Sequence, residues 1–264
     1  MDWIETATPR QLARIAGGLY LLVVIGGGFA IGYVDGVIIV PGDAAATVHN
    51  ISSHEQLYRF GLVAHMAILP LNILLAVIFY ELFTVVSRRL ALLVVFFTLV
   101  ATADEAANLL NQFAPLNLLN GGPYTSALSA GQLQALAYLP VDMTATSYEI
   151  QQVIFAGYLL AAGFLVFRST FLPRTVGVLL AIAGLSYLFY SFAAFISPGF
   201  ANHLVPYIQI PSGVGEISLC LWLLIAGVNP RRWNERAIAA RERDRILRGD
   251  RVSMPVKTSG LHLG

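Results

Sequence analysis

Charged side chains are scarce in this sequence. Asp, Glu, Lys and Arg together make up 12% of its 264 residues, and lysine occurs only once, as Lys257. Soluble domains carry about 25% charged residues. Hydrophobic residues account for 57% of the chain. A water-soluble enzyme, a nucleic-acid-binding protein or a disordered chain needs more polar surface than this composition supplies. The composition therefore predicts an integral membrane protein with no nucleic-acid partner.

Residues that carry common chemistry are scarce too. The single Cys220 excludes a disulfide within the chain. A retinal pigment needs a lysine inside a membrane span, but the single lysine, Lys257, lies outside the apolar segments. A bis-histidine haem needs two histidines inside the spans, but only His65 lies well inside an apolar segment. H-E-x-x-H, G-x-S-x-G and Walker sequences are absent from the sequence. We therefore predict no cofactor and no metal site of recognisable spacing.

Long apolar runs are abundant. A helix needs about 20 apolar residues to cross the ~30 Å hydrocarbon layer. The runs lack the two-residue alternation of barrel strands, so they predict helices. The fold class expected is all-α, an integral membrane bundle of six helices. The predicted spans are Leu12–Tyr33, Phe60–Val86, Leu90–Gln112, Tyr148–Phe167, Thr175–Ile196 and Leu204–Ala226.

The stretch before the fourth span is ambiguous. Leu128, Leu133, Leu136 and Leu139 recur at near-helical spacing and end at Pro140. A seventh span here would move the basic C-terminal tail to the opposite side of the membrane. We therefore predict a surface or re-entrant helix over residues 126–140 that leads into the fourth span.

The basic residues predict the orientation. With six spans, every Lys and Arg except Arg59 falls on the same side as the termini. The positive-inside rule then places both termini in the cytoplasm, as expected for a multi-pass protein of the cell membrane. The predicted domains are a six-span region, 1–229, and a basic cytoplasmic tail, 230–264, that is partly helical and then disordered.

Two local features predict packing. Asp43 follows a Pro-Gly turn and is placed to cap a short helix, while Glu55 and Arg59 are four residues apart with the acid first, the favourable order for an ion pair. Gly28-x-x-x-Gly32 allows two helices to approach closely. Packing within one subunit is the preferred explanation, and a seam between two copies of the chain is the alternative.

Polar side chains inside the predicted spans are the main functional signal, because an ionisable group near the bilayer centre costs about 2.5–3.5 kcal/mol. They lie in the outer halves of the spans or at the midplane, so we predict a polar cavity that opens on the extracytoplasmic side. Asp104 and Glu105 are adjacent and diverge by about 100°, so only one of them can face that cavity. The predicted lining residues are His65, Asn72, Asp104, Glu105, Asn108, Glu149, Gln152, Gln209 and Glu216.

Several blocks of the sequence together form a pattern typical of one family. They are Arg14-Ile15-Ala16-Gly17, Val40-Pro41-Gly42-Asp43-Ala44, Leu57-Tyr58-Arg59-Phe60-Gly61, Gln132-Leu133-Gln134-Ala135-Leu136, Phe167-Arg168-Ser169, Leu172-Pro173-Arg174 and Gly215-Glu216 with Leu221-Trp222. In these blocks the chain resembles a bacterial membrane family catalogued as "domain of unknown function 4386". The resemblance covers residues 10–229 and implies a multi-pass protein of the cell inner membrane, with no established activity and no catalytic residue to transfer.

Three functions are compatible with these residues, and the sequence leaves open whether the protein is an enzyme. The preferred hypothesis is that the cavity binds or passes a small apolar or amphipathic molecule, a lipid or a proton. The second is an intramembrane hydrolase whose metal is held by His65, Glu216 and either Asp104 or Glu105. The third is a membrane anchor or scaffold whose basic tail lies on anionic lipid.

Overall fold

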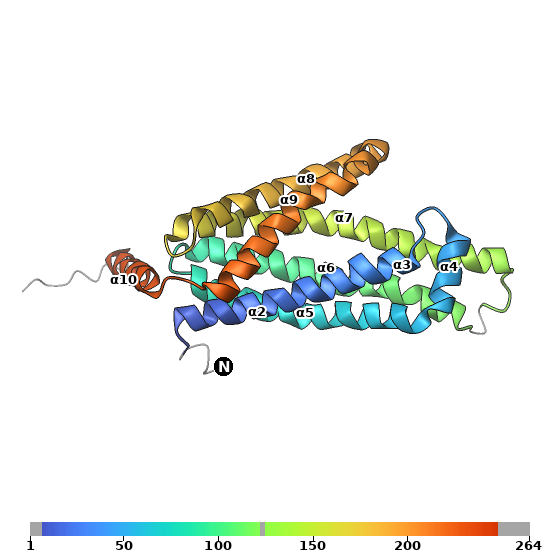
Figure 1. Ribbon diagram of the computed structural model, residues 1–264, viewed down its shortest axis with the longest axis horizontal. Helices are drawn as coiled ribbons and strands as arrows, with labels where there is room; N and C mark the ends of the chain where they lie inside the picture. The colour runs from blue at the N-terminus through green and yellow to red at the C-terminus, as the bar shows by residue number, and fades with distance from the viewer. Residues whose placement is uncertain (1–6, 122–124, 248–264) are drawn as a thin grey trace, which may run out of the picture.

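The computed structural model describes residues 7–121 and 125–247, and within these residues it contains helices and no strand. Figure 1 shows the helices packed lengthwise into an elongated bundle. They are α2 (Pro9–Gly27), η1 (Gly28–Asp35), α3 (Gly36–Ile38), α4 (Ala44–Ser53), α5 (Glu55–Phe83), α6 (Arg88–Leu119), α7 (Ala130–Ser169), α8 (Arg174–Ile196), α9 (Pro198–Ile225) and α10 (Pro230–Leu247).

Six of the described helical segments are long and apolar enough to cross a membrane, which confirms the predicted all-α membrane bundle. The first span is longer than predicted, because α2 continues through the π-helical turns of η1 and through α3 to Ile38. Large apolar side chains remain exposed along the flanks of the bundle, as contact with lipid tails requires. Examples are Leu22, Phe96 and Ile225, which are between 55% and 68% exposed.

The stretch before the fourth span is not a seventh span and leads into the fourth span, as predicted, but it is part of that span's helix and not a separate surface or re-entrant helix. Residues 130–140 form the first turns of α7, a single helix of 40 residues that also contains the fourth span. Ser129 begins this helix with a capping box, in which its side chain and that of Gln132 each accept a hydrogen bond from the other's backbone N–H. Pro140 lies inside this helix and does not end it. At 1.5 Å per residue α7 is about 60 Å long, roughly twice the hydrocarbon thickness.

The spans form a closed ring in which each helix contacts the next in the chain and α9 returns to contact α2. Figure 1 shows that the α8–α9 hairpin diverges from the other helices at the end remote from the termini, where α7 continues beside α4. Asp43 caps α4 by accepting a hydrogen bond from the Ala46 N–H, at 2.9 Å. The Arg59 guanidinium lies 2.7 Å from the Glu55 carboxylate in the first turns of α5.

The start of α2 and the helix α10 lie at the same end of the bundle (Figure 1), as an even number of crossings requires. The Trp233 indole N–H donates to the carbonyl of Leu82, at 3.0 Å, and the Arg232 guanidinium donates to the carbonyl of Thr170, at 3.1 Å. The helix α10 is therefore held against the ends of the spanning helices. The rest of the predicted tail, residues 248–264, lies outside the described residues.

Two apolar clusters occupy opposite ends of the bundle interior. The larger one, which includes Phe79, Leu165 and Leu223, lies toward the termini. The smaller one, which includes Ile38 and Leu62, lies toward α4. Neither cluster therefore fills the interior in the middle of the bundle.

The close helix approach predicted at Gly28 and Gly32 is not found within the chain. A Cβ atom added at either position would meet no atom within 4 Å. The close approach occurs at Gly17 instead, where an added Cβ would overlap the backbone of Leu223 and Leu224 in α9. The crossing of α2 and α9 therefore depends on Gly17, because only a residue without a side chain lets the two backbones touch.

We expect Gly17→Ala to destabilise the bundle by about 1–3 kcal/mol, the usual cost of overpacking. The matched control is Gly18→Ala in the same helix, because an added Cβ there meets no atom within 4 Å. Thermal unfolding of both variants in detergent micelles measures the difference. Equal unfolding temperatures for the two variants would contradict this packing.

Candidate functional site

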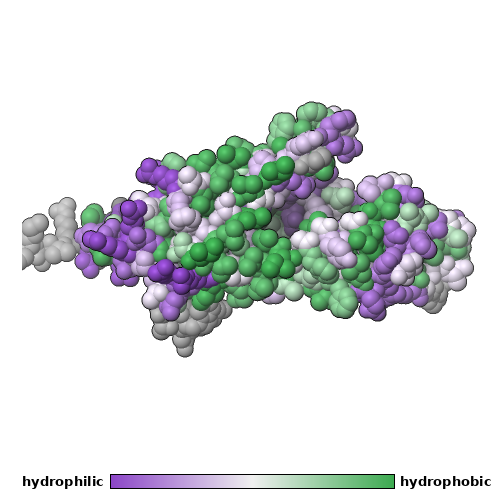
Figure 2. Space-filling view, in the orientation of Figure 1, coloured by the Kyte–Doolittle hydropathy of each residue, from purple (hydrophilic) through white to green (hydrophobic). Residues whose placement is uncertain are grey.

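A cavity of about 480 Å³ lies in the middle of the bundle, between the two apolar clusters. All six spans contribute to its wall. Its volume falls within the range of about 300–1,000 Å³ that is typical of small-molecule sites. Figure 2 shows a hollow with a hydrophilic interior on the face that α9 crosses, with hydrophobic surface on the side toward the termini.

Seven of the nine residues that the sequence suggested line this cavity. They come from four different helices and are His65, Asn72, Glu105, Glu149, Gln152, Gln209 and Glu216. Asp104 and Asn108 do not line it. The structure thus gathers most of the suggested residues around one space.

The two exceptions have different causes. Asp104 diverges from Glu105 around α6 and accepts a hydrogen bond from the Ser147 hydroxyl of α7, at 3.4 Å. Asn108 is 3% exposed and accepts a hydrogen bond from Asn111, at 3.2 Å. It follows Glu105 by three residues and so lies about one turn closer to the α4 end of the bundle, outside the cavity wall.

A network of hydrogen bonds around Glu105 forms the first polar part of the wall. Glu105 Oε1 lies 2.6 Å from His65 Nδ1 of α5, and Glu105 Oε2 accepts a hydrogen bond from the Gln151 amide of α7, at 2.9 Å. The ring of Tyr148 stacks on that of His65, with its hydroxyl 3.4 Å from His65 Nε2. Both carboxylate oxygens are thus engaged, which compensates for burying the side chain of Glu105, 8% exposed.

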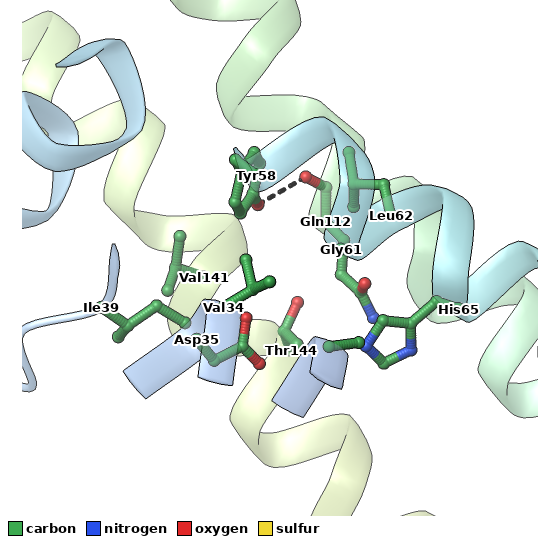
Figure 3. Close-up of a pocket in the computed structure, with 11 residues that line it drawn as sticks. Val34, Asp35, Ile39, Tyr58, Gly61, Leu62, His65, Gln112, Val141 and Thr144 are labelled. Atoms are coloured by element: carbon green, nitrogen blue, oxygen red, sulfur yellow. Dashed lines mark hydrogen bonds between the residues drawn. The ribbon is translucent and has the colours of Figure 1, made fainter. Parts of the chain in front are cut away.

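The network continues toward α4 into a second, smaller pocket, shown in Figure 3. The Gln112 amide donates to the Tyr148 hydroxyl, at 3.2 Å, and the Tyr58 hydroxyl donates to the carbonyl of Gln112, at 2.7 Å. Asp35 and His65 both line this pocket, whose volume is about 20 Å³. It is therefore large enough for about one water molecule.

Glu216 of α9 forms the second polar part of the wall. The Tyr20 hydroxyl of α2 donates to Oε2, at 3.1 Å, and the Tyr187 hydroxyl of α8 donates to Oε1, at 3.0 Å. Aromatic rings surround this carboxyl group: Phe155 stacks on Tyr158 with centroids 5.0 Å apart, and Phe155 meets the edge of Tyr187 at 5.9 Å. Three helices thus hold the Glu216 carboxyl group at the cavity wall.

Several of these residues were not among the predicted lining residues, and for Asp35 and Tyr20 the reason is identifiable. The predicted first span ended at Tyr33, so Asp35 was placed outside it. The π-helical turns of η1 carry the helix onward, and Asp35 lines the small pocket beside His65. Tyr20 lies within the predicted first span, and its partner Glu216 lies 196 residues away, a distance at which no local pattern connects two side chains.

The metal-binding set of the hydrolase hypothesis is not assembled. Among the described residues, no three His, Cys, Asp or Glu side chains gather in a group that could hold a metal ion. His65 pairs with Glu105, whereas Glu216 pairs with two tyrosines of other helices. The arrangement thus favours a hydrogen-bonded wall over a hydrolytic metal centre.

We expect His65→Ala to lower the free energy of unfolding by about 1–3 kcal/mol, because it leaves Glu105 buried with one fewer partner. The control is His203→Ala, since His203 is exposed and a ring nitrogen lies at hydrogen-bonding distance from the carbonyl of Gly199 within its own helix. Chemical denaturation in micelles checks both variants, and an equal loss for the two would show that the His65–Glu105 contact contributes little.

The chain was also compared with known proteins. No curated protein and no solved structure matches it. The model of one family, described as "Domain of unknown function (DUF4386)", matches residues 15–227. This match covers all six spans and confirms the resemblance seen in the sequence blocks. The chain is therefore a multi-pass membrane protein that belongs to the DUF4386 family.

Proposed function

We propose that this protein binds a small amphipathic molecule in its central cavity. The observation that carries the proposal is a space of about 480 Å³, within the spanning region, whose wall combines apolar side chains with polar ones, seven of which the sequence suggested. A purely structural bundle would fill this region with apolar side chains, because interiors pack to crystal-like density.

The cavity wall is divided in a way that suits an amphipathic molecule. Ile68, Leu75 and Phe79 provide apolar surface along α5. His65 and Glu105 provide hydrogen-bonding groups about one turn nearer to α4. An apolar chain beside the first group would therefore have an acidic group of the same wall, Glu105 or Glu216, available for its polar end.

One polar atom of the wall supports a ligand directly. Gln152 Oε1 is buried and accepts no hydrogen bond from the described residues. A buried acceptor without a donor costs about 1–3 kcal/mol. A bound molecule that donates a hydrogen bond to Gln152 would recover this cost, so the side chain is better explained by binding than by packing.

The proposed entry route is lateral, from the bilayer. The helices α2 and α9 touch at Gly17 and Leu224, and α9 diverges at the other end, as Figure 1 shows. Ile31 and Gln209 line the cavity and are both exposed. The hollow in Figure 2 adjoins hydrophobic surface and lies on the side of the spanning helices, so a molecule dissolved in the bilayer would reach it without crossing water.

A photolabelling experiment tests the binding. A diazirine-bearing octanol would be photolysed with the protein in lipid nanodiscs and the labelled residues mapped by mass spectrometry. We expect label on cavity residues and expect Gly27→Leu to remove most of it, because Gly27 lines the cavity and an added Cβ there meets no atom within 4 Å.

Gly18→Leu is the matched control, since it adds the same side chain to the same helix at a position that also has open space but does not line the cavity. It should leave the labelling of the cavity unchanged. Label confined to the outer surface of the bundle, or unaffected by Gly27→Leu, would refute the proposal.

We also propose that both termini lie in the cytoplasm and that α4 lies on the opposite side of the membrane, because nearly all Lys and Arg residues belong to the terminal side. In a Cys220→Ala background, we expect a membrane-impermeant maleimide to label His49→Cys in intact cells. It should label Arg241→Cys only after permeabilisation. Both replaced residues are exposed, so the reverse pattern would overturn this orientation.

A further inference from the structure

We infer that the molecule bound by the central cavity is an organic cation, an amphiphile whose polar end is an ammonium group. This inference rests on the proposed function and specifies its ligand class. It comes from the charge of the wall, its hydrogen-bonding groups and its aromatic rings, which point to the same chemistry.

The charged groups of the wall are almost all acidic. Glu105, Glu149 and Glu216 line the cavity, whereas His65 is the one residue among the lining set that can carry a positive charge. No Lys or Arg belongs to that set. A charge in a low-dielectric site needs a counter-charge nearby, so the complement of this wall is a cation rather than an anion.

The uncharged polar groups favour a hydrogen-bond donor. Gln152 Oε1 is a buried acceptor without a donor among the described residues. The donors around Glu105 and Glu216 are already engaged: His65 and Gln151 contact the first carboxylate, and two tyrosine hydroxyls donate to the second. An alkylammonium supplies N–H donors and accepts none, as the lysine side chain does.

The aromatic rings provide a surface that attracts cations. The rings of Phe155, Tyr158 and Tyr187 contact one another with centroids 5.0–5.9 Å apart, beside the Glu216 carboxyl group. Tyr20 and Tyr190 line the same cavity. A cation within about 6 Å of a ring centroid is attracted by the ring quadrupole, most strongly where water is excluded. Aromatic faces next to a carboxylate are thus suited to an ammonium group.

A competition experiment tests the inference. The labelling of the cavity by diazirine-bearing octanol would be measured in nanodiscs at neutral pH with rising amounts of octylamine, octanol or octanoate. These competitors share one chain and differ in charge, because an alkylamine is protonated and a carboxylic acid ionised at neutral pH. Concentrations are expressed per lipid. We expect octylamine to displace the label at a concentration lower than that of octanol by a factor of about ten or more, and a ten-fold ratio corresponds to about 1.4 kcal/mol.

Glu216→Gln should reduce this preference for the amine, because it removes a carboxylate from the wall and keeps its size. The control is Glu81→Gln, which changes an exposed Glu of α5 that does not line the cavity. It should keep the preference. Partition of the amine into the bilayer is the same for both variants, so the difference between them reports on the cavity alone.

Each outcome separates the two proposals. Label in the cavity that octanol or octanoate displaces as well as octylamine overturns the cation inference and leaves the binding function intact. A preference for the amine that Glu216→Gln does not change also overturns the inference, since the carboxylate would then have no part in it. Absence of label from the cavity overturns the binding function itself.

Discussion

The constraint on which this structure depends is the cost of placing hydrogen-bonding and ionisable side chains at the depth of the hydrocarbon, where water cannot satisfy them. The chain meets it by pairing these groups across helices. Glu105 of α6 is held by His65 of α5 and Gln151 of α7, and Glu216 of α9 by tyrosines of α2 and α8. The same pairs fix the wall of the cavity, so packing and binding rely on one set of contacts.

The distribution of small and apolar residues explains why the cavity lies where it does. Gly17 lets α2 touch α9 near the termini, and the larger apolar cluster closes that end of the bundle. A smaller cluster closes the end near α4. Between them the walls carry polar and aromatic side chains, and α9 diverges from its neighbours (Figure 1). The arrangement leaves a space enclosed at both ends and exposed at the side, the direction from which an amphiphile in the bilayer would arrive.

Much of this could be predicted from the sequence because the bilayer imposes simple rules. Apolar length identified the six spans, and the cost of buried polar groups selected residues of which seven line one cavity. Helical geometry predicted that only one of Asp104 and Glu105 faces the cavity, but not which: Glu105 lines it and Asp104 contacts α7. Asp35 was missed because the π-helical turns of η1 carry the first span beyond its predicted end, and Tyr20 because no local pattern links it to Glu216. The helix α7, which contains Pro140, is also longer than apolar length alone predicts, because it continues beyond the hydrocarbon layer.

The central claim is that a molecule from the bilayer occupies the space between the His65–Glu105 pair and Glu216. A cryo-electron microscopy map of the protein in lipid nanodiscs, at a resolution that shows ordered water, tests it most directly. The account predicts continuous, elongated density in the cavity, with one end within hydrogen-bonding distance of Gln152. A cavity that contains only separate water peaks, or that is filled by rearranged side chains of the wall, would contradict it.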